Sequence, residues 1–168
     1  LAQEKINVNQ ANNNGATPLQ IACQNNYKEI VQFLLKQKKI KVNQAREDGT
    51  TPLAIASQNG HKKIVELLLK NKNIEVNKSD INGLTPLCLI CQENHGSENG
   101  HKEIVELLLN HEDIAVNQAT AGFTPLFIAS ESGSKEVVNL LLEHKNIEVN
   151  KSERNGVTPL LIASQNGH

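Results

Sequence analysis

The sequence predicts an all-α solenoid in which helix-turn-helix pairs stack side by side and β-turn fingers project from the stack. Two observations predict this fold class. The tripeptide Thr-Pro-Leu occurs five times, with its threonines at positions 17, 51, 85, 124 and 158, so successive copies begin 34, 34, 39 and 34 residues apart. The 168-residue chain also has no Trp, one Tyr and three Phe, so its core must be aliphatic. Repeats of this length are typical of stacked-repeat proteins.

Each repeated unit is expected to open with a short helix. In the second copy the hydroxyl of Thr51 can cap this helix, and Pro52 fits the first helical position because no amide hydrogen is needed there. The helix should end near Asn59-Gly60, since Gly tolerates the left-handed backbone that closes a helix. Asn26 takes the place of this Gly in the first copy.

A second helix and a projecting finger are expected next. The helix runs from about His61 to Asn71 and has an apolar face too broad for an isolated helix, so neighbouring units must cover it on both sides. An Ile-x-Val-Asn segment and a Gly-containing tip then predict a projecting β-turn with positive φ at the Gly. The tip glycines are Gly15, Gly49, Gly83, Gly122 and Gly156.

Four motifs recur in this unit: Gly-x-Thr-Pro-Leu, a small-residue first helix, Gly-His-x-x-Ile-Val-x-Leu-Leu-Leu and a closing Val-Asn. Over essentially the whole chain they are similar to the ankyrin repeat. The resemblance implies a curved stack of antiparallel helix pairs that binds other proteins on the concave face of fingers and first helices. The Gly-Ala-Asp usual before Val-Asn is replaced by a longer stretch, so the second helix must end without its Gly. The His usual after Thr-Pro-Leu is replaced by Gln20, Ala54, Cys88, Phe127 and Leu161.

The repeat register divides the chain into units. Residues 1–10 are the end of a preceding repeat, residues 11–44, 45–78, 79–117 and 118–151 are full repeats, and residues 152–168 are the first helix of a truncated repeat. The chain is therefore expected to be a segment of a longer array and to be monomeric. The third repeat has a six-residue insertion within 92–99, which is interpreted either as a tolerated surface loop or as an added partner contact.

Positions that vary between copies predict the partner-binding surface, because a position that serves the stack should keep its residue. Just before each Thr and just after each Leu, the residues turn from small or polar to bulky and apolar toward the C-terminal half. This trend predicts an apolar groove with a polar rim, centred on Phe123 and Phe127. Alternatively, these side chains pack against adjacent fingers or a further repeat. The predicted partner-binding residues are Ile81, Asn82, Leu84, Cys88, Phe123, Phe127, Arg154, Val157 and Leu161.

Composition argues against several other classes of function. The net charge is -1 and charges of both signs are interleaved, whereas nucleic-acid and anionic-membrane surfaces need a concentrated positive field. The apolar runs are too short to span a bilayer, and no signal-peptide pattern opens the chain. Three cysteines, an odd number, argue against a disulfide framework and favour an intracellular, cytoplasmic location.

One set of residues suggests chemistry. Cys88, Cys91 and His95 are spaced so that one helical face could present three zinc ligands or a redox pair. However, no fourth ligand is evident, and Cys91 occupies a register position held elsewhere by Ser or Cys, which is typical of a small packing residue. His61 and His101 share one register and are expected to be structural. The sequence therefore predicts no metal, no cofactor and no catalytic residue.

Two functions remain open at this point. The chain is either a protein-interaction scaffold or a regulatory or targeting segment of a larger enzyme, channel or effector whose activity lies outside it. The family resemblance also implies a modification, since some ankyrin repeats carry a hydroxylated finger asparagine. The matching positions here are Asn43, Asn77, Asn117 and Asn150.

Overall fold

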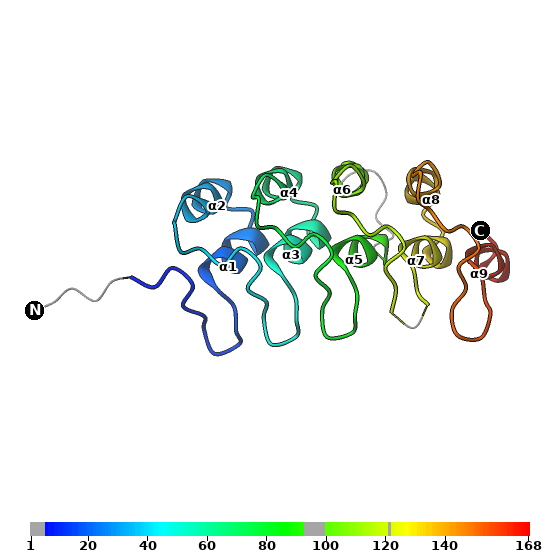
Figure 1. Cartoon of the computed structure of the whole chain (residues 1–168), viewed down its shortest axis with the longest axis horizontal. Coiled ribbons are helices and arrows are strands. Elements are labelled where there is room, and N and C mark those ends of the chain that lie inside the picture. Colours follow the sequence, from blue (N-terminus) through cyan, green and yellow to red (C-terminus); the bar gives the residue numbers. More distant parts are fainter. Residues whose placement is uncertain (1–5, 93–99, 121) are drawn as a thin grey trace, which may run out of the picture.

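The computed structural model describes residues 6–92, 100–120 and 122–168, and within them it contains helices and no strand. The first helices, α1, α3, α5, α7 and α9, form one layer, and the second helices, α2, α4, α6 and α8, form the other (Figure 1). The helices are α1 (Pro18–Gln24), α2 (Lys28–Leu35), α3 (Pro52–Gln58), α4 (Lys62–Leu69), α5 (Pro86–Gln92), α6 (His101–Leu109), α7 (Pro125–Ser132), α8 (Lys135–Leu142) and α9 (Pro159–Asn166). The predicted all-α repeat solenoid is confirmed.

None of the helices in the described ranges combines the length and the hydropathy that crossing a membrane requires. The insertion predicted within 92–99 falls almost wholly outside the described residues, which resume at Gly100.

The first helices begin and end as their sequence predicts. Thr51 Oγ1 accepts a hydrogen bond from the Ala54 amide at 3.1 Å, and Pro52 occupies the first turn. Asn26, which replaces the closing Gly of the first unit, has a φ of 58° and is the one non-glycine residue in the described ranges with a positive φ. The side-chain cap at the start and the left-handed residue at the end therefore limit α1, α3, α7 and α9 to about two turns.

Polar side chains end the second helices in place of the missing glycine. After α4, Lys70 keeps right-handed helical backbone, and Asn71 Oδ1 accepts a hydrogen bond from the amide two residues later at 3.0 Å. His111 Nδ1 and His144 Nδ1 accept the equivalent bond in the next two units, at 3.2 and 3.3 Å. The helix α4 is also slightly shorter than the predicted His61–Asn71 helix. It ends at Leu69, because Lys70 and Asn71 belong to the turn that follows it.

Each unit buries its apolar face only because its neighbours cover it. Ile55 and Ile64 of the second unit are 5% and 0% exposed, whereas the equivalent Ile21 and Ile30 of the first unit are 40% and 48% exposed. At the other end, Leu160 is 76% exposed, although the same Leu is buried in the preceding copies. The core is thus continuous along the stack and open at its two end faces.

Asparagine side chains tie each finger base to the following unit. Asn77 Nδ2 donates to the carbonyl of Asp113 at 2.6 Å, and its Oδ1 accepts from the amide of Ala115 at 2.9 Å. Asn43 and Asn117 make the same pair of bonds to the units that follow them. Each asparagine amide therefore satisfies one carbonyl and one N–H in the turn that follows the next unit's second helix.

Two histidines form a second set of bonds between units. His61 Nε2 donates to the Gln24 carbonyl at 3.1 Å, and His101 Nε2 donates to the Gln58 carbonyl at 3.0 Å. Both carbonyls lie at the end of the preceding unit's first helix. The structural role predicted for these histidines is therefore confirmed.

Asn77→Ala is expected to lower the free energy of unfolding by about 1–3 kcal/mol, because it removes two hydrogen bonds to the next unit, each of which contributes about 0.5–1.5 kcal/mol. Asn150→Ala is the matched control, since Asn150 holds the same register position but is exposed at the end of the last full repeat. Its effect should stay within about 0.5 kcal/mol. Urea denaturation followed by circular dichroism measures both, and equal losses would contradict the role of the Asn77 bonds.

Candidate protein-binding surface

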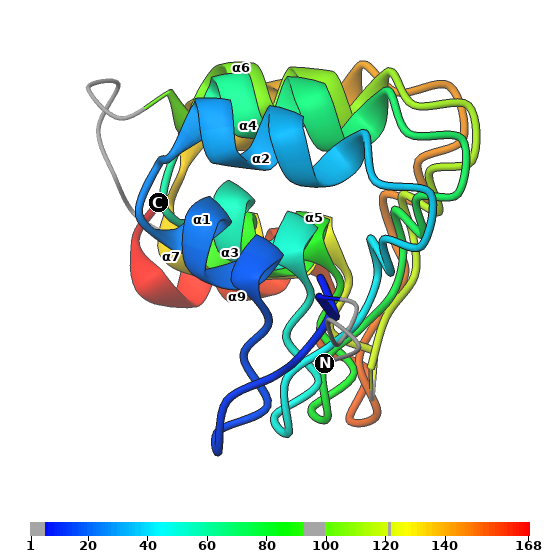
Figure 2. The same ribbon diagram turned by 90° about the vertical axis from the view of Figure 1, so that its left-hand side faces the viewer.

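The fingers project from the first-helix layer on the side away from the second helices (Figure 2). We call the surface on this side the finger face. Its members are residues 12–16, 46–50, 80–84, 122–123 and 153–157 of the fingers, together with Gln24 at the end of α1. A hydrogen bond between Arg46 Nη2 and Gln24 Oε1, 2.6 Å long, shows that finger and helix-end side chains meet there.

The predicted partner-binding residues divide by exposure. Ile81 is 72% exposed, Leu161 46% and Phe123 39%, and the side chains of Asn82 and Arg154 are also exposed. Leu84 and Val157 are half-buried. Two residues do not reach solvent, namely Cys88 at 0% and Phe127 at 2% exposed. That the seven accessible residues bind a partner remains a prediction.

The exposure expected of Cys88 and Phe127 is wrong, because the position after Thr-Pro-Leu faces the following unit. At this position Gln20 Nε2 donates to the Thr50 carbonyl of the next finger at 2.9 Å, and Cys88 Sγ lies 3.8 Å from the Gln118 carbonyl. Leu161 holds the same position but is exposed, because no described unit follows it. Gln20 therefore supplies a bond between units in place of the usual His, and the position belongs to the stack.

Phe127 nevertheless contributes to the finger face, because its buried ring supports the exposed ring of Phe123. Its ring contacts that of Phe123 edge to face, with centroids 5.2 Å apart and planes at 73°. The amide of Phe127 also donates to Thr124 Oγ1, which fixes the start of α7. Since such aromatic pairs are stabilising, the buried ring holds the exposed ring in place. Phe123 is thus an apolar contact on a rigid support.

The three cysteines are packing residues. Burial raises the pKa of Cys23 to about 12, and it raises the pKa values of Cys88 and Cys91 as well. Because the thiolate is the nucleophile and metal ligand, these buried thiols are poorly suited to either role. His95, the third residue of the suggested ligand set, lies outside the described residues. In the described part of the chain, no three His, Cys, Asp or Glu side chains gather so that they could hold a metal ion.

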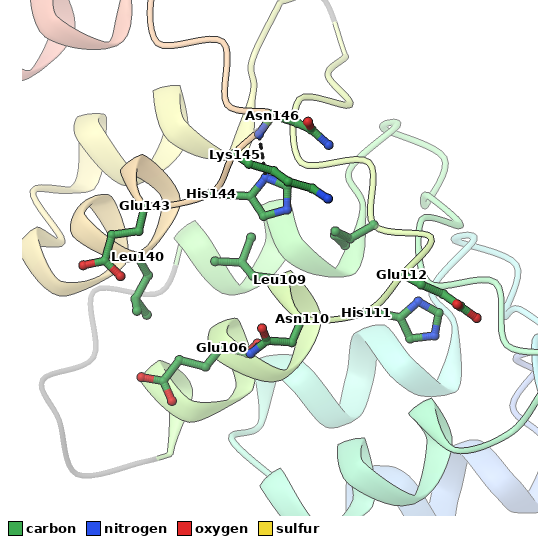
Figure 3. Close-up of a pocket in the computed structure, with 11 residues that line it drawn as sticks. Glu106, Leu109, Asn110, His111, Glu112, Leu140, Glu143, His144, Lys145 and Asn146 are labelled. Carbon is green, nitrogen blue, oxygen red and sulfur yellow. Dashed lines mark hydrogen bonds between the residues drawn. The ribbon is translucent and has the colours of Figure 1, made fainter.

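A hollow of about 690 Å³ lies on the other side of the molecule, between the ends of α6 and α8. Figure 3 shows His144 in it with a dashed bond to the backbone of Asn146, and His111 lies on the neighbouring turn. Both rings use Nδ1 to end their helices, as described above. The carboxylates of Glu106 and Glu143 point away from His144 in this view. The hollow therefore shows turn-forming side chains rather than a convergent reactive site.

Comparison with known proteins agrees with the repeat architecture. A family model described as "Ankyrin repeats (3 copies)" matches residues 1–80, 73–153 and 96–168, which together span the chain. No curated protein matches the sequence significantly. The family model places no individual residue in a binding site, so the finger face is defined by the structure alone.

Proposed function

We propose that this chain, which belongs to the ankyrin-repeat family, is a protein-binding scaffold that holds its partner on the finger face. Ankyrin repeats are generally protein–protein interaction modules, and domains built from them are typically non-catalytic. The proposal adds to this family property a location, which is the C-terminal half of the finger face. It also assigns the chain no reaction of its own.

The observation that carries the proposal is the exposure of large apolar side chains on neighbouring fingers. Ile81 is 72% exposed at the third finger, and Phe123 is 39% exposed at the fourth. Half-buried Leu84 and Val157 continue the apolar character on either side. Protein interfaces commonly have an apolar centre, and aromatic residues on rigid supports often dominate their energetics. The pair Phe123 and Phe127 provides that arrangement.

The experiment is affinity capture from a cell lysate with the parent chain, Phe123→Ala and Phe33→Ala as parallel baits. Phe33→Ala is the matched control, because Phe33 is 64% exposed but lies on the second helix α2, away from the fingers. Both variants should keep the helical circular dichroism of the parent, since both side chains are substantially exposed. A protein retained by the parent and by Phe33→Ala, but lost with Phe123→Ala, supports the proposal.

The opposite pattern contradicts it. If the captured protein is lost with Phe33→Ala and kept with Phe123→Ala, the partner binds at α2 instead of the fingers. If both variants retain it equally, neither aromatic side chain contributes to binding, and the assignment to the finger face fails.

The cysteines favour an intracellular location for this interaction. Cys23, Cys88 and Cys91 are all free and buried, so none forms a disulfide in the described structure. Disulfides are common in small secreted domains and rare in reducing compartments. Three unpaired thiols in a stable core are therefore consistent with a cytosolic scaffold.

A further inference from the structure

Arg46 departs from the residue type that opens the other fingers. In three of the other fingers the equivalent position holds Asn12, Asp80 and Glu153, whose side chains accept hydrogen bonds from amides of their own turns. For example, Asp80 Oδ1 accepts from two amides of its finger, both at 2.9 Å. In the second finger Asp48 takes over this role, because its Oδ1 accepts from the Thr50 amide at 2.8 Å. The side chain of Arg46 is therefore not needed to form the finger.

The guanidinium of Arg46 is held in position but mostly unused. Nη2 donates to Gln24 Oε1 at 2.6 Å, while Nε is enclosed by the protein and has no hydrogen-bond acceptor among the described residues. A guanidinium carries five N–H donors and binds a carboxylate best through two parallel bonds. The contact with Gln24 fixes its direction across the corner between finger and first helix. The Arg46 guanidinium thus has the donors and the fixed orientation needed to bind a carboxylate.

Among the described residues, the carboxylates near Arg46 do not form an ion pair with its guanidinium. No ion pair joins it to a carboxylate within the part of the chain that the structure describes. Asp48 has a lowered pKa mainly because of its hydrogen bonds with Thr50, and the charge of Arg46 is a smaller cause. The hydrogen bonds that lower the pKa of Asp48 therefore lie within its own finger. A positive charge on the finger face remains available to a ligand.

Arg46 and Phe123 lie two units apart on the same face. Packed helices are about 8–10 Å apart, so the two side chains are separated by about 20 Å along the stack. An extended peptide covers about 3.3 Å per residue and would bridge this distance in about six residues. Exposed Ile81, on the finger between them, would meet the middle of such a peptide.

We infer that the finger face binds an extended peptide segment of its partner, with an aspartate or glutamate side chain on Arg46 and a large apolar side chain on Phe123, about six residues apart. The inference rests on the proposed function and deepens it by naming the ligand chemistry, and it extends the binding surface from the C-terminal half of the finger face to the second finger. The acidic residue sets the register through a bidentate pair, and the apolar residue supplies most of the buried area.

The test begins with selection of peptides from a displayed random library of 12 residues on the immobilised full chain. Enriched peptides should share an acidic residue and a large apolar residue about six positions apart. One enriched peptide is then synthesised with its acidic residue intact or changed to the amide, and its Kd is measured by fluorescence anisotropy. The parent chain, Arg46→Gln and Phe123→Ala are compared after circular dichroism has shown that each is folded.

The expected result is a double-mutant cycle with strong coupling. Changing the acid to its amide should weaken binding to the parent chain by about tenfold or more, and binding to Arg46→Gln by less than about twofold. If the change from acid to amide weakens binding equally to the parent chain and to Arg46→Gln, the acid does not contact Arg46 and the inference is overturned. Enriched peptides that depend on Phe123 but share no acid overturn the inference and leave the proposed function standing. If no peptide depends on either residue, both fail.

Discussion

Gly49→Ala is expected to lower the free energy of unfolding by about 3 kcal/mol, because it disrupts the contact between two fingers. Gly49 has a φ of 80°, and a Cβ there would lie 2.6 Å from the amide nitrogen of Ile81 in the next finger. That nitrogen donates to the Asp48 carbonyl at 3.1 Å, so the fingers are joined by backbone at this point. Backbone atoms cannot move aside as a flexible side chain can. The fingers must therefore separate or the turn must change conformation.

Gly156→Ala measures the cost of the strained backbone without the steric contact between fingers. Gly156 has nearly the same φ, 82°, but a Cβ there would meet nothing within 4 Å. Its substitution should cost about 1 kcal/mol, the usual cost of a left-handed alanine. Urea denaturation of both variants, followed by circular dichroism, measures the difference. Similar losses would show that only the φ angle matters and that contact between fingers adds little to stability.

Most of the fold could be predicted because each local signal has one physical reading. A Thr-Pro pair caps and starts a helix, and the structure shows the Thr51 hydroxyl accepting the predicted bond. A left-handed residue ends a helix, and Asn26 takes that conformation where the Gly is absent. For the turn after the second helix, the sequence predicts only that the helix ends without its usual Gly. That Asn71, His111 and His144 would replace it by accepting an amide could not be seen without the geometry of the turn.

The candidate site is harder to predict, because its residues are inferred to be exposed from their variation between copies. The position after Thr-Pro-Leu shows why this inference fails. It is buried against the next unit, yet Gln20 reaches a carbonyl there, Ala54 fills a smaller space and Phe127 meets another ring. A buried position can vary when its surroundings vary with it.

The same register argument, used differently, would have found Arg46. Polar caps open three of the other fingers, and a long cation in this position is a departure that the turn does not require. Its partner Gln24 could not be identified in advance, because the two residues lie in different units. Sequence registers show where a unit is unusual, whereas contacts between units show what the unusual residue does.

Phe127→Ala is expected to lower the free energy of unfolding by about 3–5 kcal/mol, the range for truncating a large buried aromatic side chain. Phe127 is 2% exposed, and its ring packs edge to face on Phe123. Removing it would leave a cavity between the fourth unit and the next and would release the Phe123 ring. Phe33→Ala, the same substitution at a side chain that is 64% exposed, should change stability by no more than about 0.5 kcal/mol.

Thermal and urea denaturation of these two variants and of Phe123→Ala decide between a core role and a contact role for Phe127. A large loss with Phe127→Ala and small losses with the other two show that Phe127 supports the finger face without forming it. A binding defect in Phe127→Ala must then come from a displaced Phe123 ring, so binding should weaken no further when Phe123→Ala is added. If Phe127→Ala instead keeps full stability and still loses its partner, the ring is reached by the partner directly, and the buried position must open when the partner binds.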